Sequence, residues 1–261
     1  MRRRWSAESE AATGLDADAA GALAGAPQAG SGEPREAGVG RGAAASSTGS
    51  GGGAVAGLAG GHGDVFMPTG YEPGYAYPLL VWLPGRSGAR FDLGRTMARL
   101  SLRNYIAVRP LQASDDADVE SSMWRALDHL RERLTVHPDR IFLVGRGRGG
   151  TEAFRIACRH ATTFAGAVSI DGPFPHGERA FARLADVRRL PMLFCCRENA
   201  PPGVVRPTEA TLRLFHAAGA MLAMRVYPAR EGTGRAILAD VNRWLMDEIC
   251  GASLPRKVSC G

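Results

Sequence analysis

Alternating glycines follow a short apolar run near the middle of the chain, and their spacing allows two kinds of chemistry and one purely structural explanation. Ile141–Val144 leads into the segment Gly145-Arg146-Gly147-Arg148-Gly149-Gly150. Glycines at 145, 147 and 150 satisfy the dinucleotide pattern G-x-G-x-x-G, with Asp171 as the acidic residue expected about 20 positions later. A nucleophile turn of the form G-x-S-x-G would need serine where Gly147 stands. A plain tight turn between a strand and a helix needs only small residues.

Nucleophiles and bases elsewhere in the chain are sparse. Ser169 and Cys195 each lie at the end of an apolar run, and His176 follows the first of them. A Ser169–His176 or Cys195–His176 pair would supply a nucleophile and its base, but turn polarity explains His176 and core packing explains Cys195. An acidic run precedes a helical pattern and is suited to capping that helix rather than to binding a metal. Its members are Asp115, Asp116, Asp118 and Glu120.

Arginines gather where the apolar runs end, and this placement favours an anionic ligand. Guanidinium groups bind carboxylates and phosphates through paired hydrogen bonds, and a helix beginning after Gly147 would add positive potential. An arginine-rich composition also explains such a gathering by chance. The candidate ligand-binding residues are Arg86, Arg146, Arg148 and Arg235, with Arg109 and Arg197 at neighbouring run ends.

Composition excludes several classes of protein. The 261 residues carry a formal net charge of +6, but Lys257 is the only lysine. This bias is typical of a GC-rich coding sequence, and no nucleic-acid-binding motif accompanies it. Five cysteines without a C-x-x-C pair indicate neither a disulfide framework nor a zinc site, and favour a cytoplasmic location. No apolar stretch is long enough for a membrane span, and no cofactor is predicted.

Three segments differ in composition. Residues 1–62 are rich in Ala, Gly and Ser and lack aromatic residues after Trp5, which predicts a disordered N-terminal tail. Residues 63–250 alternate apolar runs with amphipathic patterns, and residues 251–261 are predicted to be a flexible C-terminal tail. The predicted strands are 64–67, 79–83, 105–108, 141–144, 167–170, 192–195 and 223–227. The predicted helices are 93–102, 119–134, 151–160, 178–187, 208–218 and 237–249.

Strands that are apolar throughout and alternate with helices predict an α/β domain. Its sheet should be doubly wound and mostly parallel, with helices on both faces. In such sheets ligands bind beyond the carboxyl ends of the strands. The glycine-rich segment and the arginines both follow strands, so we expect them to meet at that edge.

The ordered region resembles the α/β-hydrolase superfamily, in particular its phospholipase/carboxylesterase branch of feruloyl-esterase-like serine esterases. The resemblance lies in Tyr77–Gly85, Pro138–Gly145, Gly149-Gly150, Phe164–Val168, Leu190-Pro191 and Asp240–Leu245. It implies a serine, an acid and a histidine at three loop positions, together with an oxyanion loop. In this chain the three catalytic positions hold Gly147, Asn199 and Gly232, and the oxyanion-loop histidine is replaced by Pro84.

These replacements predict a catalytically inactive pseudohydrolase with a degenerate triad. Gly147 offers no nucleophile, and an amide at Asn199 carries no charge to stabilise an imidazolium. Such a protein would bind a small anion or another protein. Two alternatives remain. One is an active carboxylesterase or phospholipase-type hydrolase with a displaced or rearranged nucleophile, including one that uses Ser87, and the other is an interaction protein acting through residues 1–62.

Overall fold

The computed structural model describes most of the region predicted to fold. The described residues are 53–83, 85, 91–111, 118–175, 187–199, 213, 215–217, 219–230 and 233–251. Residues 1–52 of the predicted N-terminal tail and residues 252–261 of the predicted C-terminal tail lie outside these ranges. The helices predicted at 178–187 and 208–218 also fall largely outside them.

The end predicted for the N-terminal tail, residue 62, is wrong by several residues. Ala54–Gly57 forms strand β1, which pairs antiparallel with β2 (Gly63–Met67), and the 3-10 helix η1 (Ala59–Gly61) lies between them. All four β1 residues are exposed, so backbone hydrogen bonds rather than apolar burial hold the strand. Composition carries no signal of that pairing.

Within the described ranges, eight strands form one sheet in the order β1-β2-β4-β3-β5-β6-β7-β8. The β1–β2 and β2–β4 pairs are antiparallel, and the other pairs are parallel. The predicted mostly parallel α/β sheet is therefore confirmed. The remaining strands are β3 (Tyr77–Leu83), β4 (Ile106–Pro110), β5 (Val136–Arg146), β6 (Gly166–Ile170), β7 (Met192–Arg197) and β8 (Leu222–Tyr227).

The strand order reverses at β3. From β3 the chain passes to β4 on one side, then returns to β5 on the other side. In open parallel sheets such a reversal leaves a crevice beyond the carboxyl ends of the two strands that flank it. Here those ends are Leu83 and Arg146, so the glycine-rich segment lies at the reversal.

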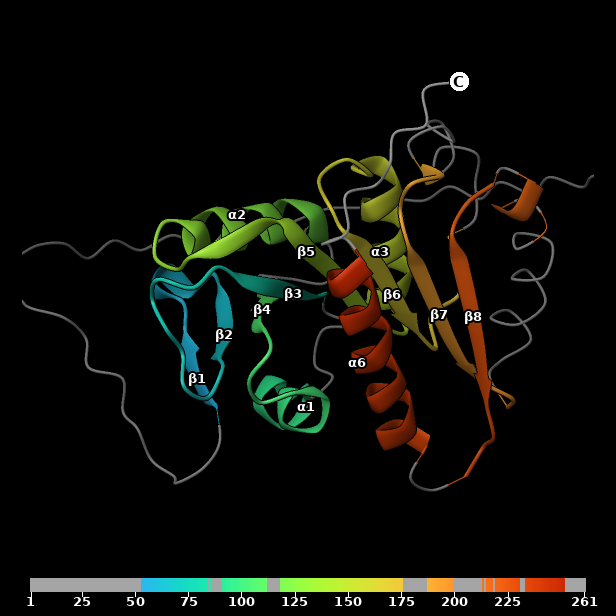
Figure 1. Ribbon diagram of the computed structural model, residues 1–261, viewed down its shortest axis with the longest axis horizontal. Helices are drawn as coiled ribbons and strands as arrows, with labels where there is room; N and C mark the ends of the chain where they lie inside the picture. The colour runs from blue at the N-terminus through green and yellow to red at the C-terminus, as the bar shows by residue number, and fades with distance from the viewer. Residues whose placement is uncertain are drawn as a thin grey trace, which may run out of the picture. The chain divides into compact units, whose positions relative to one another are not determined.

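Helices cover both faces of the sheet (Figure 1). On one face lie α2 (Val119–Arg131) and α3 (Arg148–Arg159), and on the other lie α1 (Leu93–Leu100) and α6 (Thr233–Gly251). Each pair of helices packs on its own buried cluster, because successive strand residues point to opposite faces.

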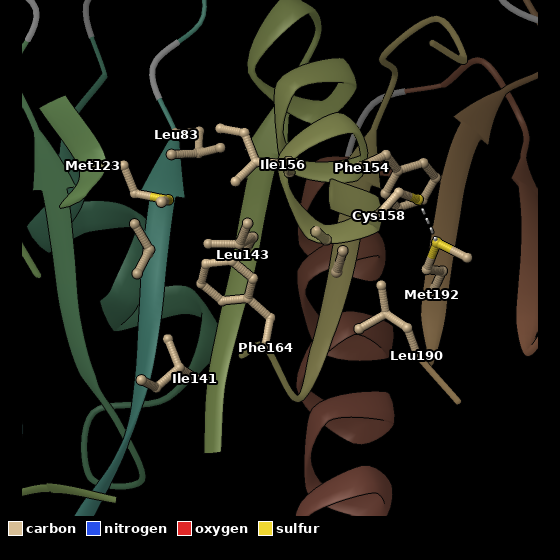
Figure 2. Packing of buried hydrophobic residues seen from close by; sticks show 14 of the residues in the cluster. Leu83, Met123, Ile141, Leu143, Phe154, Ile156, Cys158, Phe164, Leu190 and Met192 are labelled. Atoms are coloured by element: carbon tan, nitrogen blue, oxygen red, sulfur yellow. Dashed lines mark hydrogen bonds between the residues drawn. The ribbon is translucent and has the colours of Figure 1, made fainter. Parts of the chain in front are cut away.

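The core under α2 and α3 fixes the helix that follows the glycine-rich segment. Figure 2 shows Ile156 of α3 near Leu83 of β3 and Phe154 near Met192 of β7, and these four side chains are buried. The Cys158 thiol lies 4.0 Å from the Met192 thioether sulfur. Burial of side chains of this size contributes about 1.5–3 kcal/mol each. This packing holds α3 firmly against the parallel strands.

Helix α6 is amphipathic. Val241 and Leu245 are fully buried against the sheet, one turn apart, while Arg235 and Arg243 are exposed. Of the helices in the described part of the chain, none combines the length and the apolar character needed to cross a lipid bilayer.

Asp118 caps the N-terminus of α2. Its carboxylate accepts hydrogen bonds from the Ser121 hydroxyl at 2.6 Å and from the Glu120 and Ser121 backbone N–H groups at 3.2 Å. The Ser121 hydroxyl contributes most to lowering the pKa of Asp118 below its usual 3.8. The predicted capping role of this acidic residue is confirmed, whereas residues 115 and 116 lie outside the described ranges.

We expect Asp118→Ala to reduce the free energy of unfolding by about 1 kcal/mol at neutral pH. A carboxyl with a lowered folded-state pKa stabilises the fold above its unfolded pKa, and this contribution disappears as pH falls through the folded pKa. The difference between the variant and the parent should therefore shrink as pH falls to about 3. Urea unfolding across this pH range measures it. Asp118→Asn is the control, because its amide oxygen caps the helix without titrating. A difference that does not change with pH would contradict the prediction.

Candidate functional site

The turn from β5 to α3 is sharp, and Gly147 forms its apex. This residue has φ 55° and ψ −128° and stands at the N-cap of α3. Its N–H donates to the Ile170 carbonyl oxygen at 2.8 Å, which ties the turn to the end of β6. A Cβ atom built at Gly147 would have no atom within 4 Å. Space for a side chain is therefore present, although the backbone conformation is one that L-residues rarely adopt.

The glycines on either side serve a different purpose, because they permit close packing. A Cβ at Gly145 would lie 2.1 Å from the Gly149 carbonyl oxygen, and a Cβ at Gly150 would lie 2.4 Å from Ser169 Oγ. Both approaches are far shorter than a van der Waals contact. Tight strand–helix packing thus accounts for these two glycines without a bound dinucleotide, whereas crowding does not account for Gly147.

The other positions singled out from the sequence are only partly described. Asn199 lies in an exposed turn after β7, next to Glu198, whose N–H donates to the Tyr227 carbonyl oxygen at 2.9 Å. Outside the described residues lie Pro84, Arg86, Ser87, His176 and Gly232. Within the described ranges, no group of three His, Cys, Asp or Glu side chains is arranged to hold a metal ion.

The two described candidates for a displaced nucleophile are buried. Ser169 is 1% exposed, and its hydroxyl is enclosed by the close backbone approaches at Gly150 and Gly172. Cys195 is fully buried, and burial raises the pKa of its thiol to about 12. Its sulfur lies 3.8 Å from the Tyr227 hydroxyl, which donates to Asp240 at 3.0 Å. A thiol with such a pKa carries almost no thiolate at neutral pH.

Asp171 organises the charges at the ends of β5, β6 and β7. It is the only non-glycine residue with positive φ, 53°, in the described part of the chain, and its side chain is 10% exposed. Its carboxylate accepts from Arg197 Nε at 3.1 Å and lies 3.0 Å from Arg197 Nη2, while Arg146 Nη2 lies 3.5 Å away. Two guanidinium groups thus share one carboxylate. This carboxylate is therefore not free to bind the ribose of a dinucleotide.

The predicted arginines do not form a single cluster. Arg109 pairs with Asp64 and donates to the Phe91 carbonyl oxygen at 3.3 Å, so it supports the sheet. Arg148 and Arg235 are exposed. Arg146, whose side chain is 58% exposed, lines a cavity.

That cavity has a volume of about 520 Å³ and lies at the reversal of strand order. Trp82 of β3, Arg146 of β5 and Ile170 of β6 line one side. The other side comes from the start of α6 and from α1 with the residues just before it. Sequence reasoning placed only Arg146 here and missed Trp82, Phe91, Arg95 and Arg99. The arginines at 95 and 99 had one local signal, their four-residue spacing on a predicted helix.

The comparisons with known proteins concern the fold. No family model matches the chain, and no curated protein matches its sequence. A ferulic acid esterase aligns with a TM-score of 0.57 and 16% identity, covering 71% of this chain and 92% of that one. The fluorophosphonate-binding serine hydrolase FphF of Staphylococcus aureus aligns with a TM-score of 0.57 and 13% identity, covering 75% and 99%.

A thermostable esterase aligns with a TM-score of 0.57 and 15% identity, covering 71% of this chain and 58% of that esterase. The chain thus spans less than two thirds of that esterase's length. Identities this low make the resemblance one of backbone architecture.

Proposed function

Because the chain has the α/β-hydrolase fold, we propose that it is a pseudohydrolase, which binds a ligand at the carboxyl edge of its sheet without cleaving esters. In this proposal Gly147 stands at the nucleophile position, Asn199 at the acid position, Gly232 at the base position and Pro84 in the oxyanion loop. None of the four side chains can act as a nucleophile or a general base.

The observation that carries the proposal is the backbone of Gly147. Its φ and ψ angles are open to glycine but would strain any residue with a Cβ atom, yet nothing crowds the position a side chain would occupy. For a residue with a Cβ atom such a conformation costs about 1–3 kcal/mol, and it persists where the surrounding structure enforces it, often at functional sites. If a nucleophilic residue at this position were replaced by glycine, the turn would keep this geometry and the space for the side chain would stay empty.

The alternative function is that of an active carboxylic-ester hydrolase that uses a displaced nucleophile. It is favoured by the solved structures of similar fold, which include an esterase and a fluorophosphonate-binding serine hydrolase. Burial of Ser169 and of the Cys195 thiol weighs against these two as nucleophiles, because a substrate carbonyl would have to reach them inside the sheet. Binding through residues 1–62 is a separate proposal, tested by whether that segment alone retains a partner.

Activity-based labelling together with ester hydrolysis separates the two functions. We expect the folded chain to release no p-nitrophenol from short-chain p-nitrophenyl esters above the heat-denatured control. We also expect no labelling by a fluorophosphonate probe under conditions that label a serine esterase completely. Gly147→Ser should stay inert as well, because a hydroxyl without an adjacent base is a weak nucleophile.

Labelling that disappears on substitution of a single serine or cysteine would overturn the proposal. Ser169→Ala, Ser87→Ala and Cys195→Ala are the variants that identify such a residue. Circular dichroism of each variant distinguishes loss of a nucleophile from loss of the fold.

A further inference from the structure

We propose that the cavity beside Arg146 binds an organic carboxylate with an apolar body, such as a medium-chain fatty acid or an arylalkanoic acid. This inference rests on the proposed function, because it names the ligand class for the same edge of the sheet. Three features carry it: the size of the cavity, the apolar surface of its walls and the excess of positive charge along its lining.

The size of the cavity excludes a bare inorganic ion as its full occupant. Its 520 Å³ lies within the range of about 300–1,000 Å³ typical of sites for small organic ligands. The rings of Trp82 and Phe91 lie 5.4 Å apart and form an aromatic wall, and Ile170 and Ile237 add aliphatic surface. A ligand that fills this space therefore needs an apolar body.

The charged lining residues are three arginines and one aspartate. Asp92 is already engaged, because it accepts from the Arg95 N–H at 2.8 Å and its carboxylate lies 3.8 Å from Arg95 Nε. Arg146 reaches Asp171 only at 3.5 Å, and Arg197 approaches the same carboxylate to 3.0 Å. The lining therefore keeps an excess of positive charge, centred on Arg99 and Arg146, for a ligand anion to offset.

A carboxylate suits this lining better than a neutral polar group. Guanidinium groups match its two oxygens with parallel hydrogen bonds. The first turn of α6 also reaches the cavity with the positive end of its dipole, whereas the Asp92 carboxylate already caps α1. The buried Nε1–H of Trp82 has no acceptor among the described residues. Because the Trp82 ring lines the cavity, its indole N–H resonance reports on whether a ligand fills the space beside the ring.

Isothermal titration calorimetry with octanoate tests the inference, with octanamide as the neutral ligand of the same length. We expect saturable binding of octanoate at one site and at least about tenfold weaker binding of octanamide, since hydrogen bonds to charged groups are the stronger ones. Arg146→Gln should weaken octanoate binding about tenfold. Arg131→Gln, an exposed arginine on α2 across the sheet, should leave it unchanged.

A second variant and a second readout do not depend on charge. Thr96→Phe places a ring in the cavity from a half-buried position on α1 and should abolish octanoate binding while the circular dichroism spectrum stays the same. In a ¹⁵N spectrum, the indole N–H resonance assigned to Trp82 by a Trp82→Phe variant should shift on titration with octanoate.

Three outcomes would overturn the inference: no saturable binding of octanoate, equal affinity for octanamide, or unchanged affinity in both Arg146→Gln and Thr96→Phe. Tight binding of octyl phosphate without octanoate binding would also overturn it, in favour of a phosphate site. Octanoate has no ester bond, so calorimetry reports on this inference alone. Release of p-nitrophenol reports on the proposed function alone, which keeps the failures of the two distinguishable.

Discussion

Gly145→Ala is expected to lose about 3 kcal/mol or more of its free energy of unfolding. The new Cβ would lie 2.1 Å from the Gly149 carbonyl oxygen and 2.6 Å from the Gly150 nitrogen. Both are backbone atoms in the first turn of α3, so relief requires the whole helix to move away from β5. Urea unfolding followed by circular dichroism measures the loss.

Two alanine variants separate crowding from backbone conformation. Gly147→Ala meets no atom within 4 Å but must adopt φ near 55°, so we expect an intermediate loss of about 1–3 kcal/mol. Gly234→Ala lies in the first turn of α6 with open space around it and should gain up to about 1 kcal/mol. Equal losses in Gly145→Ala and Gly147→Ala would show that steric overlap with α3 is not the cause.

Phe174→Ala is expected to reduce the free energy of unfolding by about 3–5 kcal/mol. Phe174 is 1% exposed, and its ring centroid lies 5.3–5.6 Å from those of Phe154, Phe194 and Phe215. Removing the central ring of this group leaves a cavity that three rings held on separate elements cannot fill. The segment after β6 stays tethered in the variant, because the Thr151 hydroxyl still donates a 2.5 Å hydrogen bond to the Pro173 carbonyl oxygen.

Denaturant unfolding of a small set of variants checks this expectation. Leu111→Ala removes an exposed apolar side chain and should change stability by no more than about 0.5 kcal/mol. A double-mutant cycle between Phe154 and Phe174 should give a coupling energy of about 0.5–1.5 kcal/mol, the range measured for aromatic pairs. A loss in Phe174→Ala as small as that in Leu111→Ala would mean that the ring is not part of a packed core.

The sequence was sufficient to predict seven of the eight described strands and the helices α1, α2, α3 and α6. The apolar run Ile141–Val144 became the buried part of β5, and the helices expected from residues 93, 119, 151 and 237 are all present. These predictions succeeded because apolar periodicity reports directly on which side chains a strand or helix buries. The predicted α/β-hydrolase fold is confirmed by the solved structures that share it.

Predictions from the local sequence pattern failed where a segment is held by backbone hydrogen bonds or adopts an unusual backbone conformation. β1 has no buried side chain, so its alanines and glycines predicted a tail. Asp171 was considered as the acidic residue of a dinucleotide-binding pattern, whereas the structure surrounds it with Arg146 and Arg197. Nothing in the residue types around position 171 indicates a positive φ or which arginines approach it.

The sequence alone determined the strands β2 to β8, the helices α1, α2, α3 and α6 and the glycine at the apex of the turn, because each depends on residues adjacent along the chain. Only the tertiary structure decided that Trp82, Arg99, Arg146 and Ile237 line one cavity. These residues lie on four different elements, and they meet because the strand order reverses at β3. Whether these residues line one cavity depends on the order in which the strands assemble, and the spacing of residues along the chain does not indicate that order.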